Sequence, residues 1–151
     1  MIVPWASYLV AALLGIAQAI VVVAYWGLYI PSNPIIDWLS ETLAQRGYST
    51  FFSVAIYSHD FILNLILAAP FMLFVSWLRP GNSYRLMWIT IAAFFLLTSG
   101  SVIFDVDAIR IFWNRPSYYF GVLISLVPAV LAYRIIVGTR HDQSSPDDAL
   151  H

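Results

Sequence analysis

The chain has 151 residues, of which 61% are hydrophobic and 10% are charged, and its formal net charge is -1. Soluble domains carry roughly 25% charged residues, so this composition excludes an ordinary soluble domain and indicates a protein whose solvent is the bilayer. The weak net charge excludes the basic surface that nucleic acids require. The absence of cysteine excludes disulfides, thiolate metal sites and iron–sulfur clusters.

Long apolar runs dominate the sequence and predict helices at about 5–30, 51–78, 86–113 and 116–137. About 20 residues of α-helix cross a hydrocarbon core of about 30 Å, and each run reaches that length. The third helix is expected to leave the membrane near Phe104 and to continue beyond it. Helices satisfy their own backbone hydrogen bonds, as lipid requires. The predicted fold is an all-α polytopic membrane protein, a four-transmembrane-helix bundle over residues 1–138.

The first apolar run has no positive charge before it and exceeds a signal-peptide core of about 7–15 residues, so we expect an uncleaved helix.

Two segments outside the apolar runs also have recognisable patterns. After the first run, Asn33 and Pro34 are typical of an N-cap and a first helical position, and Gly47 is typical of a helix end. A short amphipathic surface helix at about 34–46 is predicted, which either packs on the bundle or binds a partner. Residues 139–151 predict a disordered polar tail.

Arginine placement predicts the orientation, because positive charges concentrate in cytoplasmic loops. With both termini in the cytoplasm, the cytoplasmic side holds Arg79, Arg85, Arg134 and Arg140. The outer side then holds Arg46, Arg110 and Arg115. The bias favours cytoplasmic N- and C-termini, in a membrane that we expect to be a bacterial inner membrane.

The second apolar run carries a polar stripe. Ser53, Tyr57, Asp60 and Asn64 share one helical face through their spacing of three or four residues. Asp60 lies about 13 Å along the helix from Phe51, which predicts a position near the membrane midplane. A charged carboxylate there costs about 2.5–3.5 kcal/mol on insertion scales. Asp60 is therefore expected to face protein, water or a partner, or to keep its proton.

His59 is adjacent to Asp60 but about 100° further around the helix. We therefore expect His59 to reach a neighbouring helix or chain, as a packing residue or a ligand, rather than to share a narrow site with the aspartate. Polar groups of the first three apolar helices either converge on an outward-opening pocket between the second and third helices, or hydrogen-bond one another in a dry bundle. The candidates for binding or an ion pathway are Asp60, His59, Tyr57, Asn64, Gln18 and Ser101.

Charged residues follow the third run at the predicted outer face: Asp105, Asp107, Arg110 and Arg115. Carboxylates beside arginines suit acid–base work or a divalent ion, but charges at a helix end also form an ordinary solvated boundary. Haem between helices needs paired axial ligands, and the membrane segments hold a single histidine. No nucleophile, phosphate-loop or metalloprotease motif occurs. We therefore expect no metal site and no cofactor.

Two stripes of small residues, four apart, predict close helix contacts, because small side chains let two backbones approach. The first stripe is Ala11, Gly15 and Ala19, and the second is Ser117, Gly121 and Ser125. Each stripe is expected to face a neighbouring helix.

Three functions fit these features. The first is a non-catalytic binding protein, either a subunit of a membrane complex or an immunity-type inhibitor of a membrane toxin, because the chain is small and lacks catalytic motifs. The second is an oligomeric conduit for protons, cations or a small solute, using the intramembrane Asp60 and His59. The third is a membrane enzyme acting on a lipid or quinone at the outer charged residues. The expected partners are the bilayer and either a membrane protein or a second copy of the chain.

Overall fold

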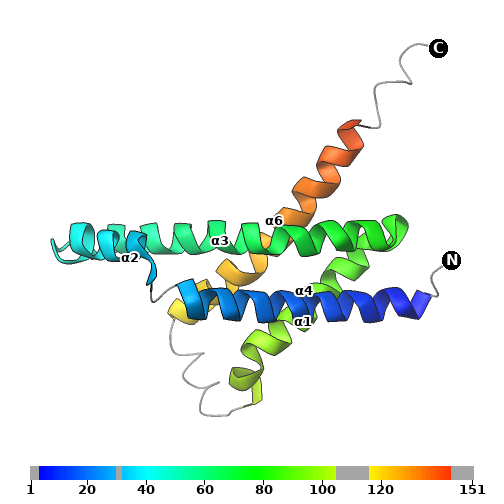
Figure 1. Ribbon diagram of the computed structural model, residues 1–151, viewed down its shortest axis with the longest axis horizontal. Helices are drawn as coiled ribbons and strands as arrows, with labels where there is room; N and C mark the ends of the chain where they lie inside the picture. Colours follow the sequence, from blue (N-terminus) through cyan, green and yellow to red (C-terminus); the bar gives the residue numbers. More distant parts are fainter. Residues whose placement is uncertain (1–3, 30–31, 105–115, 144–151) are drawn as a thin grey trace.

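The computed structural model describes residues 4–29, 32–104 and 116–143, almost all of them helical. In chain order the elements are α1 (Pro4–Tyr29), α2 (Pro34–Leu39) with its π-helical continuation η2 (Ser40–Ala44), α3 (Ser49–Leu78), the short 3-10 helix η3 (Pro80–Asn82), α4 (Ser83–Phe104) and α6 (Pro116–Gln143) (Figure 1). The all-α prediction is confirmed for this part of the chain.

Three of the described helices are long and apolar enough to cross a membrane: α1, α3 and α6. They indicate an integral membrane protein. α4 is 22 residues long, and its role as a fourth crossing stays a prediction. Its predicted continuation to residue 113 lies outside the described residues. α6 stays helical to Gln143, past residue 139 where the disordered tail was predicted to begin, because no helix-breaking residue follows Gly138 before Pro146.

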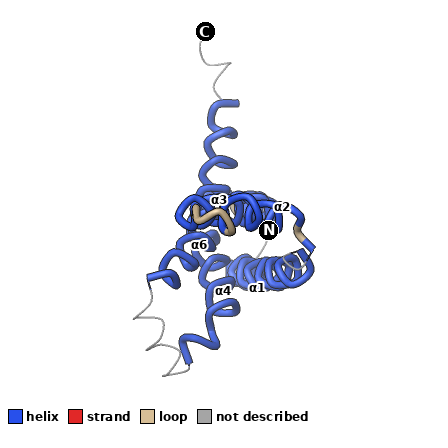
Figure 2. The backbone as a smooth tube through the Cα atoms, turned by 90° about the vertical axis from the view of Figure 1, so that its left-hand side faces the viewer, coloured by secondary structure: helices blue, strands red, loops and turns tan. Residues whose placement is uncertain are grey.

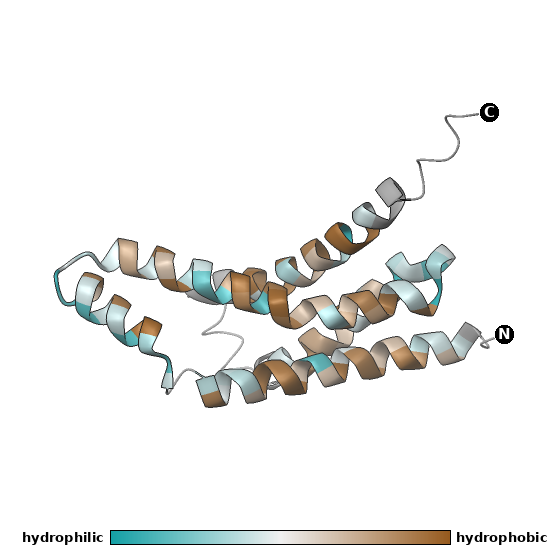
Figure 3. Cartoon of the chain, turned by 45° about the horizontal axis from the view of Figure 1, so that its top comes forward, coloured by the Kyte–Doolittle hydropathy of each residue, from teal (hydrophilic) through white to brown (hydrophobic). Residues whose placement is uncertain are grey.

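The long helices form two crossing pairs. α1 and α3 run antiparallel, and α4 and α6 cross them obliquely (Figures 1 and 2). α1 packs chiefly on α4, and α3 packs chiefly on α6. Where the helices meet, the larger buried side chains of the core are Met72, Val75, Leu86, Met87 and Tyr133. Apolar residues also cover the outward faces of the long helices (Figure 3), as contact with lipid tails requires.

α1 and α4 come into backbone contact at Gly15. A Cβ atom added to Gly15 would overlap the carbonyl oxygen of Thr90 and lie 2.9 Å from the Cβ of Ala93. At the same contact, the Thr90 hydroxyl donates to the carbonyl of Ala11 at 2.9 Å and to that of Leu86, on its own helix, at 3.0 Å. The prediction that the first small-residue stripe faces a neighbouring helix is confirmed.

The second small-residue stripe does not mark a close contact where the structure describes it. Gly121 is exposed, and a Cβ atom added there would have no neighbour within 4 Å. The Ser125 hydroxyl donates to the carbonyl of Gly121, within α6, at 2.9 Å. The structure does not describe the side chain of Ser117. The prediction is wrong for Gly121, because residue size alone does not decide whether a helix face meets protein or lipid.

The helix predicted at 34–46 begins at the predicted N-cap, and the predicted glycine follows its last turn. Asn33 is the N-cap of α2, since its Oδ1 accepts a hydrogen bond from the backbone N–H of Ile35 at 3.0 Å, and Pro34 takes the first helical position. Gly47 adopts φ +85°, a left-handed conformation that glycine tolerates at a helix end.

Between these signals the helix differs from the prediction. A short α-helix passes at Ser40 into a π-helical turn, in which the N–H of Gln45 reaches back five residues to the carbonyl of Ser40 at 3.0 Å. The helical part ends at Ala44 rather than 46. Apolar spacing over so few residues does not distinguish a wide helical turn from an ordinary one.

At the opposite end of the molecule, polar contacts join neighbouring helices. Asn82 Nδ2 donates to the hydroxyl of Tyr8 at 3.1 Å, which ties η3 to α1. The hydroxyls of Ser83 and Tyr133 share a hydrogen bond of 2.7 Å, which ties the start of α4 to α6. Both of these hydroxyl groups belong to buried residues, so each satisfies the other away from solvent.

We expect Gly15→Ala to destabilise the fold by about 1–3 kcal/mol, the usual cost of overpacking. The new methyl group meets the backbone of Thr90, so α1 and α4 must separate. Gly27→Ala is the matched control on the same helix, because a Cβ atom there has no neighbour within 4 Å. This control should be neutral or gain up to about 1 kcal/mol from helix propensity. Equilibrium unfolding in detergent measures both changes, and equal stabilities for the two variants would contradict the prediction.

Candidate functional site

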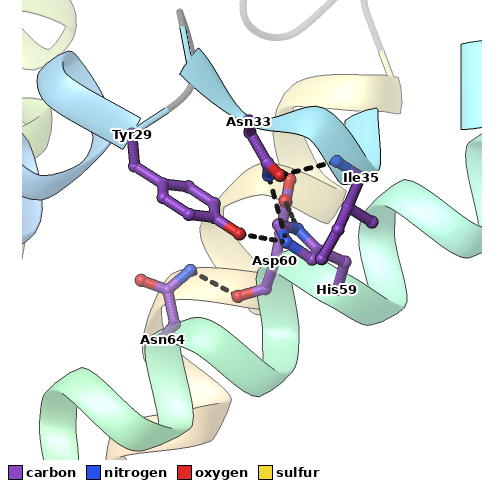
Figure 4. Close-up of polar contacts among 6 residues, drawn as sticks. All are labelled: Tyr29, Asn33, Ile35, His59, Asp60 and Asn64. Carbon is purple, nitrogen blue, oxygen red and sulfur yellow. Dashed lines mark hydrogen bonds and ion pairs between the residues drawn. The ribbon is translucent and has the colours of Figure 1, made fainter. Parts of the chain in front are cut away.

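A polar cluster lies where α1, α2 and α3 meet (Figure 4). Tyr29 comes from the last turn of α1, Asn33 precedes α2, and His59 and Asp60 come from α3. Asn33 is only 1% exposed, whereas the side chains of His59 and Asp60 are 15% and 25% exposed. The cluster is therefore partly closed from solvent, with the carboxylate on its more open side.

His59 is at the centre of this cluster. Its Nδ1 lies 3.1 Å from Oδ1 of Asp60, and its Nε2 lies 3.4 Å from Nδ2 of Asn33 and 3.5 Å from the hydroxyl of Tyr29. The Asn33 Oδ1 already accepts from Ile35, so the amide group facing His59 is the donor. His59 Nε2 then has to accept, and the ring hydrogen resides on Nδ1 and is donated to the carboxylate.

Ring stacking extends the cluster along α1. The ring of His59 lies 5.9 Å from that of Tyr29, and Tyr29 lies 4.9 Å from Tyr25, with interplanar angles of 13° and 20°. Near-parallel rings at such distances attract one another. The stack and the hydrogen bonds together hold the imidazole in one orientation, with its two nitrogens facing different partners.

The cluster lies level with the end of α1. Tyr29 is the last residue of that helix, and its partner His59 is at the same height. From Asp60 to Leu78, the last residue of α3, the helix covers about 27 Å, nearly the thickness of a hydrocarbon core. Asp60 therefore lies near one end of the part of α3 that runs beside α1, because the first turns of α3 extend past α1 (Figure 1). Its position near the membrane midplane stays a prediction.

The structure brings some of the sequence candidates together and separates others. His59 and Asp60 contact each other, contrary to the expectation from their angle around the helix. The expectation that His59 reaches a neighbouring helix is confirmed by its contact with Tyr29 of α1. Asn64 is buried, and its Nδ2 donates to the backbone carbonyl of Asp60 at 2.9 Å, one turn away. Gln18 is 2% exposed in α1, and its Oε1 has no hydrogen-bond partner among the described residues. Neither amide side chain is among the hydrogen-bond partners of the His59 ring.

The structure shows none of the remaining candidates in the polar cluster. Tyr57 is 39% exposed and faces a different surface from Asp60. Ser101 belongs to α4, but its side chain lies outside the description. The four charged candidates after α4 also lie outside the described residues: Asp105, Asp107, Arg110 and Arg115. Among the residues that the structure describes, no group of three or more His, Asp or Glu side chains is close enough to hold a metal ion.

Sequence reasoning missed two members of the cluster. Tyr29 was not among the candidate site residues, and Asn33 was interpreted only as a helix cap. Their partner is a histidine in another helix, so the cluster lies between α1, α2 and α3, and not between α3 and α4 as expected. The available signal was the closeness of Tyr29 and Asn33 in the chain, which puts both side chains at the same end of α1.

Tyr57 lines an open hollow between α3 and α6. The hollow has a volume of about 510 Å³ and is lined by Val54, Tyr57, Ser58, Phe61 and Ile62 of α3 and by Ile124 of α6. Most of these side chains are apolar, and Ile62 is 54% exposed. We call this surface the α3–α6 hollow. Its size and chemistry fit the side of an apolar helix or a lipid tail.

The hollow adjoins a helical hairpin that extends past the end of α1. This projecting hairpin consists of α2, η2 and the first turns of α3, residues 34–58 (Figures 1 and 3). Its exposed large apolar side chains are Ile35, Trp38, Tyr48, Phe51, Val54 and Tyr57. The contact of Asn33 with His59 holds the base of α2 on α3. The polar cluster therefore fixes the position of the projecting hairpin.

No protein-family model matches the chain, and no curated protein or solved structure matches it either. Any function therefore has to follow from the geometry and chemistry of the chain's own residues.

We expect Asn33→Ala and Asn33→Ser to separate the two contacts of Asn33. Alanine removes both the cap and the contact with His59, and a lost cap alone costs about 0.5–2 kcal/mol. Serine keeps a capping oxygen but loses the amide donor, so α2 should stay helical while its attachment to α3 loosens. Hydrogen exchange over residues 34–44 measures this. Equal protection in the wild type and in Asn33→Ala would contradict the prediction, and Ser32→Ala is the neighbouring control.

Proposed function

We propose that this protein acts in the bilayer by binding a partner membrane protein, as a subunit of a membrane complex or as an immunity-type inhibitor of a membrane toxin. The observation that carries the proposal is the α3–α6 hollow beside the projecting hairpin. The lining of the hollow is mostly apolar, and a transmembrane helix of a partner presents side chains of matching chemistry.

The shape of this surface supports a protein occupant. Helices in lipid associate through close van der Waals packing, because lipid tails are as apolar as leucine. A hollow of about 510 Å³ receives the side chains of a facing helix more completely than a flat helix surface does. The aromatic groups of Tyr57 and Phe61 supply large, rigid contact areas of the kind that is enriched at interfaces.

The projecting hairpin gives the partner a second, more specific contact. Trp38 is 61% exposed and Ile35 is 48% exposed on α2, whereas Asp37, Glu41 and Arg46 carry charge on the same hairpin. A partner helix in the hollow that continues past the membrane would meet this mixed surface. Apolar anchors with a charged rim are the usual arrangement of a specific interface.

Site-directed photocrosslinking in native membranes tests the proposal. A photoreactive residue at Ile62, in the hollow, should form one discrete adduct with a membrane protein, and the same group at Leu13 of α1 should not. Both positions are 54% exposed, so lipid access is matched. Ser58→Phe, which fills the hollow, should abolish the adduct, whereas Ser53→Phe, on α3 outside the hollow, should keep it.

The other outcomes of this experiment are equally informative. Lipid adducts alone, or the same adducts at both positions, would refute a protein occupant. An adduct of twice the chain's mass would identify a second copy of the chain in the hollow, which is the self-associating form of the proposal.

A second candidate function is an oligomeric pathway for protons or cations. It is favoured by the chain of contacts from Tyr29 through His59 to Asp60. The imidazole accepts at one nitrogen and donates at the other, so a proton taken up at Nε2 is balanced by one released from Nδ1 to the carboxylate. Several copies would be needed, because the described helices of one copy pack directly on one another.

Proteoliposome flux tests the second candidate. Asp60→Asn removes the proton acceptor while keeping its size, and it should lower proton flux after a pH jump to the level of empty vesicles. Asp37→Asn, an exposed carboxylate on α2, is the control and should leave the flux unchanged. Equal flux in the wild type and in Asp60→Asn would reject a role for the cluster.

Location and topology belong to the same proposal. We propose a bacterial inner membrane, with α4 as the fourth crossing and both termini in the cytoplasm. The third function, an enzyme acting on a lipid or quinone, depends on Asp105, Asp107, Arg110 and Arg115, which lie outside the described residues.

A further inference from the structure

At the end of the molecule opposite the polar cluster, an open pocket of about 620 Å³ lies between the start of α1 and the α3–α4 turn. We call it the basic pocket. It is lined by Tyr8, Arg79, Gly81, Asn82, Tyr84 and Arg85. These side chains supply two guanidinium groups, one amide and two phenol groups, and none of the lining residues is acidic.

The local sequence shapes this pocket. α3 ends at Leu78, and its C-cap residue Arg79 takes an extended conformation (φ -160°, ψ 89°), as the residue before a proline prefers. Pro80, Gly81 and Asn82 then form the single turn of η3, closed by a hydrogen bond of 2.9 Å from the N–H of Asn82 to the carbonyl of Arg79. The Asn82 side chain is held by Tyr8 of α1. One wall of the pocket is therefore fixed between two helices.

No carboxylate whose side chain the structure describes neutralises the charge of the pocket. Arg79 and Arg85 are exposed, and neither guanidinium is in ion-pair contact with one of these carboxylates. The carboxylates with described side chains are Asp37, Glu41 and Asp60, all at the other end of the molecule. The first turn of α4, which carries Tyr84 and Arg85, adds the partial positive charge of a helix N-terminus.

The aromatic residues around the pocket indicate its depth. Trp5, Trp77 and Trp88 are 66%, 60% and 46% exposed at this end of the helices. Exposed tryptophan and tyrosine concentrate at the level of the lipid headgroups. The ring of Tyr84 packs edge-on against Trp88, with centroids 6.1 Å apart. The basic pocket therefore opens at the height where phosphate groups of lipids are found.

We propose that the basic pocket binds a phosphate group, carried either by the headgroup of an anionic lipid or by a free phosphate ion. The planar fork of a guanidinium matches two phosphate oxygens at once. Arg79 and Arg85 enclose the group from the two sides of the turn, and the amide of Asn82 and the hydroxyl of Tyr8 provide neutral hydrogen bonds. Lysine, a more strongly hydrated point charge, would match this geometry less well.

Lipid binding to the purified full-length protein tests this assignment. Native mass spectrometry should show phosphatidylglycerol retained in preference to phosphatidylcholine. Arg79→Gln and Arg85→Gln should each weaken phosphatidylglycerol binding by about tenfold or more, as expected for the loss of a hydrogen bond to a charged group. Arg46→Gln, which removes the same charge at the distant projecting hairpin, should leave binding unchanged. Both pocket arginines are exposed, so these variants should fold, which circular dichroism checks.

Competition with inorganic phosphate distinguishes the two sources. Displacement of phosphatidylglycerol by millimolar phosphate, but not by chloride at equal ionic strength, would show that the free ion also binds. Lipid retention in the presence of phosphate would identify the headgroup as the ligand. The proposal is overturned if the double variant Arg79→Gln/Arg85→Gln binds phosphatidylglycerol like the wild type, or if Arg46→Gln weakens binding as much as either pocket variant.

Discussion

The backbone contact between α1 and α4 at Gly15 is the constraint on which the rest of the structure depends. Helices in lipid gain nothing by hiding apolar surface from water, so they are held by close packing and by hydrogen bonds between them. Gly15 provides the close packing, and the hydroxyl of Thr90 provides the bond to Ala11. With α1 fixed on α4, the two tyrosines near its ends are also fixed. Tyr29 then meets His59, and Tyr8 meets Asn82.

The sequence alone predicted those structural features that depend on a few neighbouring residues. The cap at Asn33 requires only the backbone N–H of Ile35, and the helix end at Gly47 requires only a positive φ. Apolar length gave the bounds of α1 and α3 to within two residues, but not the end of α6, which continues to Gln143 past the predicted 137. The second contact of Asn33, with His59, was not predictable in this way. It depends on how far α1 and α3 slide along each other, which no local pattern encodes.

The polar stripe of α3 shows the same limit. Asn64 and Tyr57 share a predicted face, yet Asn64 is 6% exposed and Tyr57 is 39% exposed. The two residues lie at different heights on α3. Asn64 is level with the body of α1, whereas Tyr57 lies past its end and beside α6. A stripe along one helix therefore predicts a common direction, but the neighbour that each residue meets is set by the lengths of the other helices.

The length of α3 has a consequence for how its end moves in bilayers of different thickness. α3 has 30 residues and spans about 45 Å, well beyond a hydrocarbon core of about 30 Å. An overlong apolar helix adapts by tilting, and the tilt changes with membrane thickness. α2 is anchored to α3 through Asn33 and His59, so it must follow that tilt. A change in the tilt of α3 would therefore carry α2 with it.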